Sequence, residues 1–433
     1  MNKHLLALFC VTIVIGGIVF ANGLYFSLAK TGTQVVGTFS LDTSWTQANS
    51  PYTLTGDILV NTGATLTVEA GVTVNLNSYN IEVKGTFYAK GNSTNNINLN
   101  AGIITFTKAS SNWDEQTSSG CIIENAIINA TQIIIHHSPK INNNTILSAP
   151  DYEITVWVGS PIISNNIFPE PATIYCGGSA LITNNTITNL PIGSYKTRPY
   201  SYGIVLCGYF NGSGNSGTVT VSNNNMGGIQ IINGCIGTMI VENNLITGIF
   251  IGTNNQITIQ NNTITYGLYI QTDLTFAYNN ILHNDTSFSI HNNYQSSVNA
   301  AYNWWGTTDG QAINQSIKYN GGTVTFTPFL TLPNLKAPPI PANIVYPTPT
   351  PPNSSTPTEE LTPLTTPSNT PKISPSITPS YSPTQIPTLE PTQTASPAIP
   401  GIQIVDYTSG IILFGAIIGV AIAVLVYVKK RRL

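Results

Sequence analysis

The sequence carries little charge. Only 8% of its 433 residues are Asp, Glu, Lys or Arg, and the formal net charge is −3. Between residues 31 and 335 the one arginine is Arg198. So few cations offer no basic face to a phosphate backbone, and we expect no nucleic-acid partner. Asn, Thr, Ser and Tyr are abundant instead, which predicts a surface that recognises partners by hydrogen bonds.

Cysteine is also scarce. Five are present, and Cys10 lies in an apolar N-terminal segment. The remaining Cys121, Cys176, Cys207 and Cys235 permit two disulfides and three possible pairings. Cys207 and Cys235 fall in consecutive repeats of the pattern described below, which favours that pair. Buried free thiols are an equally open alternative.

Acidic and histidine side chains are too scattered to predict a catalytic or metal centre. Asp151 and Glu153 are two residues apart on an expected strand, so they share a face and form the geometric candidate for paired carboxylates. Decoration of the surface is nevertheless the favoured role for that pair. Adjacent His136 and His137 point to opposite faces of a strand and are poor joint ligands. We therefore predict no cofactor and no metal.

What the sequence does contain is a short motif that recurs between residues 121 and 306, clearest at residues 259–264 (IQNNTI). Each copy has an asparagine, an apolar residue two positions earlier and another three positions later. The last copy departs from this rule, with Gly306 at the third position. The asparagines are Asn125, Asn143, Asn165, Asn184, Asn223, Asn243, Asn261, Asn279 and Asn303. A period of about 20 residues with fixed apolar positions predicts a stacked solenoid.

Each repeat contains short strands between Asn and Gly turns, so it cannot bury an apolar face alone. Wound into a coil, each strand pairs in parallel with its copy about 4.8 Å away, and the isoleucines fill the interior. The predicted fold is an all-β parallel β-helix. Asparagine suits the turns because it tolerates the left-handed region. Its amide can also bond to neighbouring turns or to stacked asparagines.

The segments on either side of the repeat body, residues 121–306, predict an exported, capped head. Residues 1–21 have the short basic start and apolar run of a signal peptide. Residues 22–120 are expected to form an N-terminal cap and the first irregular coils, because an uncapped solenoid exposes strand edges. Alternation over residues 64–74 predicts a strand, a turn and a second strand.

A C-terminal cap is expected over residues 307–335. Asp309 can N-cap a short helix there, and a final strand is expected from residue 323. Trp304 and Trp305 are expected to cover the last coil.

The C-terminal part of the chain predicts a stalk and an anchor. Residues 336–400 are rich in Pro, Thr and Ser, with proline every fourth residue from Pro363 to Pro391, which indicates a disordered, extended stalk. Residues 410–428 predict one transmembrane helix, and residues 429–433 a basic cytoplasmic tail. The prediction is a single-pass protein of the cell membrane with its β-helix head outside.

The asparagine corners, the block at residues 64–74 and the closing residues 302–306 (YNWWG) together resemble right-handed parallel β-helix proteins of the pectin-lyase-like class. They resemble in particular the membrane-anchored cell-surface β-helix proteins of archaea and bacteria. The resemblance covers about residues 50–332 and implies a right-handed helix. It does not imply one function, because that fold hosts lyases, hydrolases, epimerases, adhesins and inert heads. The aspartate clusters and Arg-x-Lys motif of the enzymes have no counterpart in this sequence.

One interval breaks the repeat. The residues between Asn184 and Asn223 hold one coil with two long excursions, residues 190–202 and 209–217. Long loops on a rigid scaffold often carry function, and aromatic side chains beside an arginine suit a sugar ring. Loops that merely protect the side of the solenoid are the alternative. The predicted ligand-binding residues are Tyr195, Lys196, Arg198, Tyr200, Tyr202, Tyr209 and Phe210.

Asn-x-Ser/Thr sequons are numerous in the chain. Asn143, Asn184 and Asn261 begin repeats, so we expect them to be unmodified if the asparagine ladder is internal. Asn211 lies in the second excursion and is the favoured glycan carrier. The predicted acceptors are Asn92, Asn129, Asn211, Asn284, Asn314 and Asn353.

The leading functional hypothesis is a non-catalytic cell-surface protein whose head binds a polysaccharide or another cell-envelope glycan. The first alternative is a surface polysaccharide lyase, hydrolase or epimerase whose catalytic residues come from different coils. The second is a purely structural surface protein.

Overall fold

The computed structural model describes residues 32–147, 153–188, 203–206, 217–232, 237–252, 256–282, 288–292 and 294–342. All of them lie in the first of two compact units, residues 1–355. The predicted signal peptide, transmembrane helix, basic tail and nearly all of the stalk lie outside the described residues. Within the described part of the chain, no helix has the length and apolar character needed to cross a membrane.

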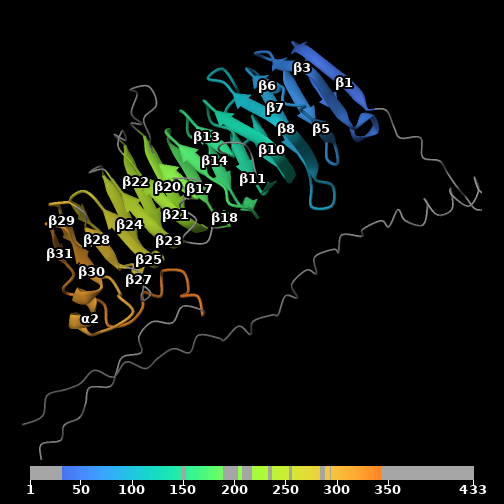
Figure 1. The fold of residues 1–433 in the computed structure, drawn as a ribbon. Coiled ribbons are helices and arrows are strands. Elements are labelled where there is room, and N and C mark those ends of the chain that lie inside the picture. The colour runs from blue at the N-terminus through green and yellow to red at the C-terminus, as the bar shows by residue number, and fades with distance from the viewer. Residues whose placement is uncertain are drawn as a thin grey trace, which may run out of the picture. The chain divides into compact units, whose positions relative to one another are not determined.

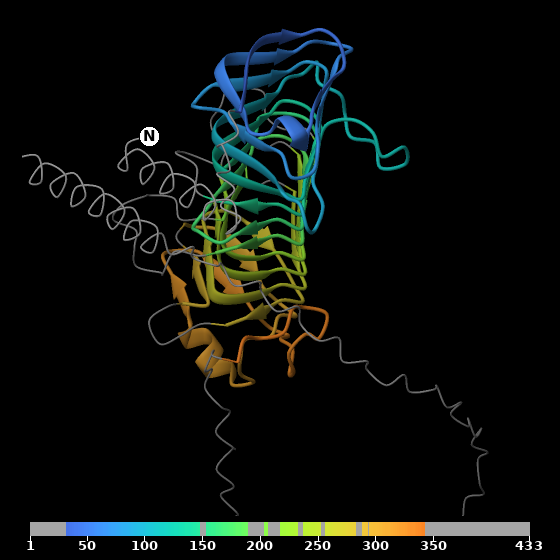
Figure 2. The same ribbon diagram turned by 90° about the vertical axis from the view of Figure 1, so that its right-hand side faces the viewer.

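The described chain winds into an all-β, right-handed parallel solenoid of about 11 turns (Figures 1 and 2). The long sheet has 18 strands. They are β1 (Thr33–Phe39), β3 (Tyr52–Val60), β5 (Thr73–Asn75), β6 (Asn80–Val83), β8 (Ile97–Phe106), β10 (Ala126–Ile135), β12 (Thr145–Ile146), β13 (Ile154–Val156), β15 (Ile167–Phe168), β16 (Ile174–Cys176), β18 (Thr186–Ile187), β19 (Ile204–Leu206), β21 (Asn225–Ile231), β23 (Leu245–Ile251), β25 (Thr263–Ile270), β27 (Asn280–Ile281), β28 (Ile290–Asn292) and β30 (Ile317–Tyr319).

A second sheet of 10 strands lies on another side of the coils. Its strands are β2 (Thr43–Trp45), β4 (Thr65–Val68), β7 (Thr86–Lys90), β9 (Ile122–Glu124), β11 (Lys140–Asn142), β14 (Ile162–Ser164), β17 (Ala180–Thr183), β20 (Thr218–Ser222), β22 (Thr238–Glu242) and β24 (Ile257–Gln260). A three-stranded sheet contains β26 (Leu274–Thr275), β29 (Ser297–Asn299) and β31 (Thr323–Thr325). Each strand pairs in parallel with its counterpart in the next coil, as the repeat predicts.

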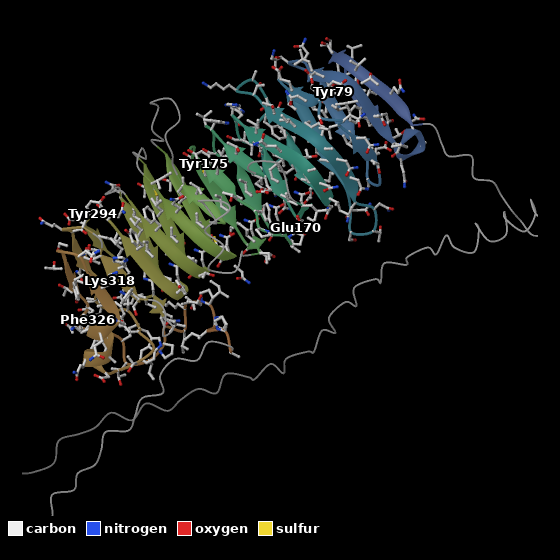
Figure 3. The ribbon with its side chains drawn as sticks, in the orientation of Figure 1. Tyr79, Glu170, Tyr175, Tyr294, Lys318 and Phe326 are labelled. Atoms are coloured by element: carbon white, nitrogen blue, oxygen red, sulfur yellow. The ribbon has the colours of Figure 1, made fainter. Side chains whose placement is uncertain are left out.

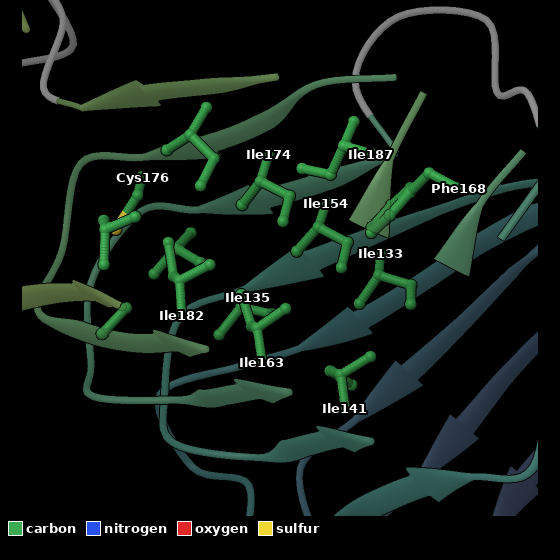
Figure 4. Close-up of a cluster of buried hydrophobic side chains, with 14 of the residues drawn as sticks. Ile133, Ile135, Ile141, Ile154, Ile163, Phe168, Ile174, Cys176, Ile182 and Ile187 are labelled. Carbon is green, nitrogen blue, oxygen red and sulfur yellow. The ribbon is translucent and has the colours of Figure 1, made fainter. Parts of the chain in front are cut away.

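The interior is a set of stacked aliphatic columns (Figure 4). One column is formed by the residues two positions before the first seven repeat asparagines, which pair directly from strand to strand and are all buried. Its members are Ile123, Ile141, Ile163, Ile182, Val221, Val241 and Ile259. Burial of each such side chain contributes about 1.5–3 kcal/mol, so the regular apolar positions dictate which face of every strand turns inward.

At the corner between the two sheets, the first residue of each Asn-Asn pair makes the turn. Asn143 has a φ of 53° and Asn223 a φ of 56°, in the left-handed region that asparagine tolerates better than most residues. Asn143 and Asn184 are exposed at this corner. The ladder is internal, but it is built by the following residue. The reason for expecting Asn143 and Asn184 to be unmodified therefore does not apply to them.

The second asparagine of each pair forms a buried ladder. The backbone N–H and the Nδ2 of Asn166 both donate to Oδ1 of Asn185, each at 3.0 Å. Nδ2 of Asn166 also donates to the Ile141 carbonyl of an earlier coil at 2.9 Å. The ladder residues are Asn144, Asn166, Asn185, Asn224, Asn244, Asn262, Asn279 and Asn303, all 2% exposed or less. Each side-chain amide forms hydrogen bonds with the asparagines before and after it. The buried stack therefore needs other hydrogen-bond partners only at its ends.

The last two repeats fit the structure with a register one residue earlier than predicted. Tyr278 and Tyr302, at φ values of 61° and 59°, occupy the left-handed position, and Asn279 and Asn303 belong to the ladder. The predicted rule places Leu282, three positions after Asn279, in the interior column. Ile281 fills that position instead, because it pairs with Ile264. In the final repeat Trp305, only 1% exposed, fills the position assigned to Gly306. The last copy is therefore not an exception to the repeat.

The N-terminal coils use the same winding without the ladder. The alternation at residues 64–74 forms β4 and β5, as predicted. At the corner, Gly71 takes the left-handed conformation with a φ of 79°, as Asn125 does with a φ of 52°. The ladder position that follows is apolar and buried in these coils, occupied by Val72, Ile97 and Ala126.

The C-terminal end is closed by a short helix and aromatic side chains. Helix α2 (Gly310–Gln315) begins after Asp309, whose side chain accepts a hydrogen bond from the Gln311 N–H, as predicted. Trp304 and Trp305 are buried, and the Trp305 ring meets Phe326 edge to face at 6.1 Å. The predicted final strand is β31.

Beyond β31 the chain turns back along the asparagine corner in a segment that we call the strap, residues 328–338. Asn334 and Asn280 are joined reciprocally, the Asn334 N–H donating to Asn280 Oδ1 at 2.7 Å and Asn280 Nδ2 donating to the Asn334 carbonyl at 3.2 Å. Asn334 Nδ2 donates to Asn261 Oδ1 at 2.9 Å, and the Thr263 hydroxyl donates to the Pro338 carbonyl. The strap thus covers the corner of coils that precede the last one.

Candidate functional site

The excursions predicted to bind ligand lie outside the described residues, including all seven of their predicted contact residues. Their points of attachment are described. The chain leaves after Thr188 and returns at Gly203, then leaves again after Leu206 and returns at Gly217. Between them lies β19, which pairs with β16 on one side and β21 on the other. The described attachment points therefore lie at β19, and the surface beside them is the outer face of the long sheet.

On that face a single row of side chains points away from the core. Each member pairs directly with the next across successive strands. Its neighbours on either side along each strand are interior residues, for example Ile249 and Ile251 around Phe250. This outer row consists of Tyr175, Val205, Gln230, Phe250, Tyr269, His291 and Lys318. Figure 3 labels Tyr175 and Lys318, the two ends of the row.

The half of the row around β19 is covered. Tyr175 and Val205 are each 4% exposed and Gln230 is 8% exposed, although all three lie on the outer face. Gln230 Oε1 is buried and has no hydrogen-bond partner, and the same holds for Oγ1 of Thr155, which pairs with Tyr175 one coil earlier. Buried polar atoms are seldom left unpaired, so these two acceptors mark places where a donor is missing.

The other half of the row is partly open and aromatic. The Phe250 and Tyr269 rings stack at 5.2 Å with an angle of 11°, and His291 meets Tyr269 edge to face at 4.8 Å. Phe288, 44% exposed, lies 6.2 Å from His291. The Lys318 ammonium sits 5.3 Å above the Phe288 ring. This open half offers ring edges, a phenol and an imidazole to the solvent.

The His291 imidazole is shifted toward its neutral form. Burial lowers its pKa from the ordinary value, and nearby Lys318 lowers it further. Its Nε2 lies 3.2 Å from the Asn320 side-chain amide. A neutral imidazole can both donate and accept a hydrogen bond, which suits a ligand with hydroxyl groups.

A second aromatic group borders the covered half. The His136 and Trp157 rings are stacked at 6.3 Å with an angle of 4°, and Trp157 lies 6.4 Å from Tyr175. Burial, and to a smaller extent Lys108, lowers the pKa of His136. Aromatic rings therefore flank the covered stretch at both ends.

Glu153 is not a surface carboxylate, contrary to the favoured prediction. It is 1% exposed, and its Oε2 accepts a hydrogen bond from the Thr173 backbone N–H at 2.6 Å. The carboxylate thereby joins one coil to the next. Asp151, the other member of the proposed pair, lies outside the described residues. Among the described residues, no three His, Cys, Asp or Glu side chains gather in a way that could hold a metal ion.

The cysteines proposed as a disulfide, Cys207 and Cys235, lie outside the described residues. Cys121 and Cys176 are buried free thiols. Burial raises the pKa of Cys121 to about 11 and that of Cys176 to about 12. Both thiols therefore stay protonated at neutral pH and are poor nucleophiles.

Of the predicted glycan acceptors, Asn92, Asn129 and Asn314 are exposed. Asn211, Asn284 and Asn353 lie outside the described residues. The exposure of the first three leaves room for a glycan, and modification itself stays a prediction.

Reasoning from the sequence missed the outer row. A signal for part of it was present, because four of its seven members follow a glycine and an apolar residue, as Gln230 follows Gly228-Ile229 and Phe250 follows Gly248-Ile249. The residue after each pair must face outward once the preceding apolar residue faces the core. Alignment of those positions from coil to coil depends on the strand register.

Comparison of the chain with protein-family models, with curated proteins and with solved structures finds no match.

Proposed function

We propose that this protein is a membrane-anchored cell-surface β-solenoid that binds a polysaccharide or another cell-envelope glycan without catalysis. The apolar leader, the Pro/Thr/Ser stalk and the apolar segment before the basic tail support display outside the cell. The likeness of the asparagine corners to the pectin-lyase-like class, and to surface β-helix proteins within it, supports the same proposal.

The observation that carries the proposal is the outer row at the base of the excursions. It combines aromatic rings with a phenol, an imidazole, an amide and one cation on a rigid surface. Sugar recognition requires this mixture, because the C–H faces of a sugar prefer aromatic carbon and its hydroxyls prefer polar tips.

A non-catalytic role is favoured over the lyase, hydrolase or epimerase alternative by Glu153. Acid–base cleavage of a glycosidic bond needs carboxyl groups that reach the substrate. The Glu153 carboxylate is buried and bonded to the backbone of the next coil, so it serves the packing of the solenoid.

The test is a glycan and polysaccharide array probed with the full-length protein and with a variant carrying Phe250→Ala and Tyr269→Ala. Each aromatic contact is worth about 0.5–1.5 kcal/mol, so we expect the double variant to bind about tenfold more weakly. Tyr79→Ala, at an exposed tyrosine of an N-terminal coil, is the matched control and should bind like the parent. Equal binding by all three proteins, or binding of no glycan, would contradict the proposal.

A further inference from the structure

Three chemically identical sequons lie at the same corner of the solenoid. Asn143, Asn184 and Asn261 each begin the tripeptide Asn-Asn-Thr, with φ values of 53°, 56° and 54°. In each case the middle residue belongs to the buried ladder, and the threonine is the first residue of the following strand. The three sites therefore share sequence, backbone conformation and place in the coil, and they differ only in what covers them.

Two of the sites are open to solvent. The Asn143 and Asn184 side chains are exposed, Thr186 is exposed, and Thr145 is half-buried. Asn143 Nδ2 donates to Asn125 Oδ1 in the preceding coil. A glycosylated amide keeps one N–H, so this bond can persist after modification.

The third site is covered by the strap. Asn334 Nδ2 donates to Asn261 Oδ1 at 2.9 Å, so the acceptor asparagine is bound on its outer side. Thr263 is fully buried, and its hydroxyl donates to the Pro338 carbonyl. The two groups that define a sequon, the amide and the hydroxyl, are both engaged by the strap.

We propose that Asn143 and Asn184 are acceptors of N-linked glycans and that the strap keeps Asn261 unmodified. In the transfer, Nδ2 forms a bond to the anomeric carbon of a lipid-linked oligosaccharide phosphate. The bond from that carbon to the phosphate oxygen breaks, the lipid phosphate leaves, and Nδ2 releases one proton. The inference rests on export of the head and is independent of any ligand on the outer row.

The ladder explains how such a modification is compatible with the fold. The buried amides of Asn144 and Asn185 make the bonds between coils, at 3.0 Å to Asn166 and 3.0 Å to Asn224. The preceding asparagine supplies the left-handed turn and points outward. A sugar attached there leaves the interior stack untouched. It also projects from the corner rather than from the strands that carry the outer row.

The experiment uses the full chain expressed in a host that N-glycosylates exported proteins and isolated from its membranes, with a co-expressed glycoprotein as the control for the host. Release of glycans by peptide-N-glycosidase in ¹⁸O-water converts each occupied asparagine to labelled aspartate, and peptide mass spectrometry reads the three sites separately. We expect Asn143 and Asn184 to be occupied and Asn261 to be about tenfold less occupied, the factor that one or two strap hydrogen bonds provide. Thr145→Ala and Thr186→Ala should each abolish only the glycan of their own site.

The second measurement removes the hydrogen bond from the strap to Asn261. Asn334→Ala should raise occupancy of Asn261 toward that of the other two sites. If neither Asn143 nor Asn184 is modified while the control glycoprotein is, the acceptor proposal is overturned. If Asn261 is as fully occupied as the others in the parent chain, or does not respond to Asn334→Ala, the shielding role of the strap is overturned.

Discussion

The coils before Asn144 and those after it build the same corner from opposite chemistry. In both regions a left-handed residue makes the turn, Gly71 in one and Asn143 in the other. The residue that follows is Val72 in the N-terminal coil and Asn144 in the repeat body, and both are buried. An apolar corner is satisfied by packing alone, coil by coil. A polar corner is satisfied only as part of an unbroken stack, because each asparagine depends on the next.

This difference predicts that the ladder coils are more cooperative than the N-terminal coils. Loss of one apolar corner residue weakens one layer of packing. Loss of one asparagine leaves the backbone N–H of its neighbour buried without an acceptor and removes the bonds of its own amide, so the penalty falls on two coils at once. The same contrast explains why the ladder runs without a gap from Asn144 to Asn303.

The largest effect is expected from Asn224→Ala, in the middle of the ladder. Asn224 Oδ1 accepts from both the N–H and the Nδ2 of Asn185, at 2.8 and 3.0 Å. Without it the N–H would lose its partner, while Nδ2 would keep the carbonyls of Ile163 and Thr183. We expect the free energy of unfolding to fall by about 3–5 kcal/mol, measured by urea denaturation. Asn223→Gly, which keeps the left-handed turn, is the control and should change stability by less than about 1 kcal/mol. Similar losses for the two variants would argue against the ladder as the stabilising element.

A smaller effect should follow from placing asparagine at the apolar corners. Val72→Asn buries an amide beside Ile97, with no ladder neighbour to bond, and should cost about 2–4 kcal/mol. Ala126→Asn extends the ladder by one rung, because the Ala126 N–H already donates to Asn144 Oδ1 at 2.9 Å. We expect it to change the unfolding free energy by less than about 1 kcal/mol. Equal destabilisation by both changes, measured by the same denaturation, would show that the ladder cannot be extended.

The smallest expected effect is a difference in the protection of two thiols. Cys121 lies in the coil just before the ladder, and Cys176 lies among the ladder coils. With Cys207 and Cys235 replaced by Ser, we expect a thiol reagent at pH 8 to label Cys176 about tenfold more slowly than Cys121, since one pKa unit changes the thiolate fraction tenfold. Faster labelling of Cys176 would indicate that the ladder coils open more readily than their neighbours.

The same thiols give stability a defined dependence on pH. Their pKa values in the folded state, about 11 and about 12, lie above the ordinary value of 9.0. The protonated thiol is therefore favoured by folding, and its contribution is complete below pH 9 and declines as the pH rises toward the folded values. Unfolding measured between pH 8 and pH 11 should show this decline, and Cys176→Ala should reduce it.

The repeat spacing was enough to predict the parallel solenoid, its aliphatic columns and an internal asparagine ladder. It was not enough to decide which asparagine of each pair makes the turn and which joins the ladder, because both are the same residue type. In the last two repeats the turn residue is tyrosine, so a rule based on asparagine placed the register one residue late. The left-handed conformation of Tyr278 and Tyr302 and the pairing of Ile281 with Ile264 reveal the shift.

The outer row of the candidate site could not be predicted from the sequence either. Its members include Val205, Gln230, Phe250 and His291, which share no chemistry that a motif could capture. They form a row because parallel pairing brings equivalent positions of successive coils to about 4.8 Å from each other. Glu153 likewise looked like a surface carboxylate beside Asp151, and its burial depends on the coil above.

By itself the sequence determined the coil, because period and apolar position decide which side chains must leave water, and burial of apolar area is the largest favourable term in folding. It also determined that each corner of the repeat body needs a residue able to adopt the left-handed conformation. The tertiary structure decided the register at each corner, the row that aligns on the outer face, and the course of the strap over Asn261. Those outcomes depend on hydrogen bonds between residues that lie one or several coils apart, and no local stretch of sequence contains both partners.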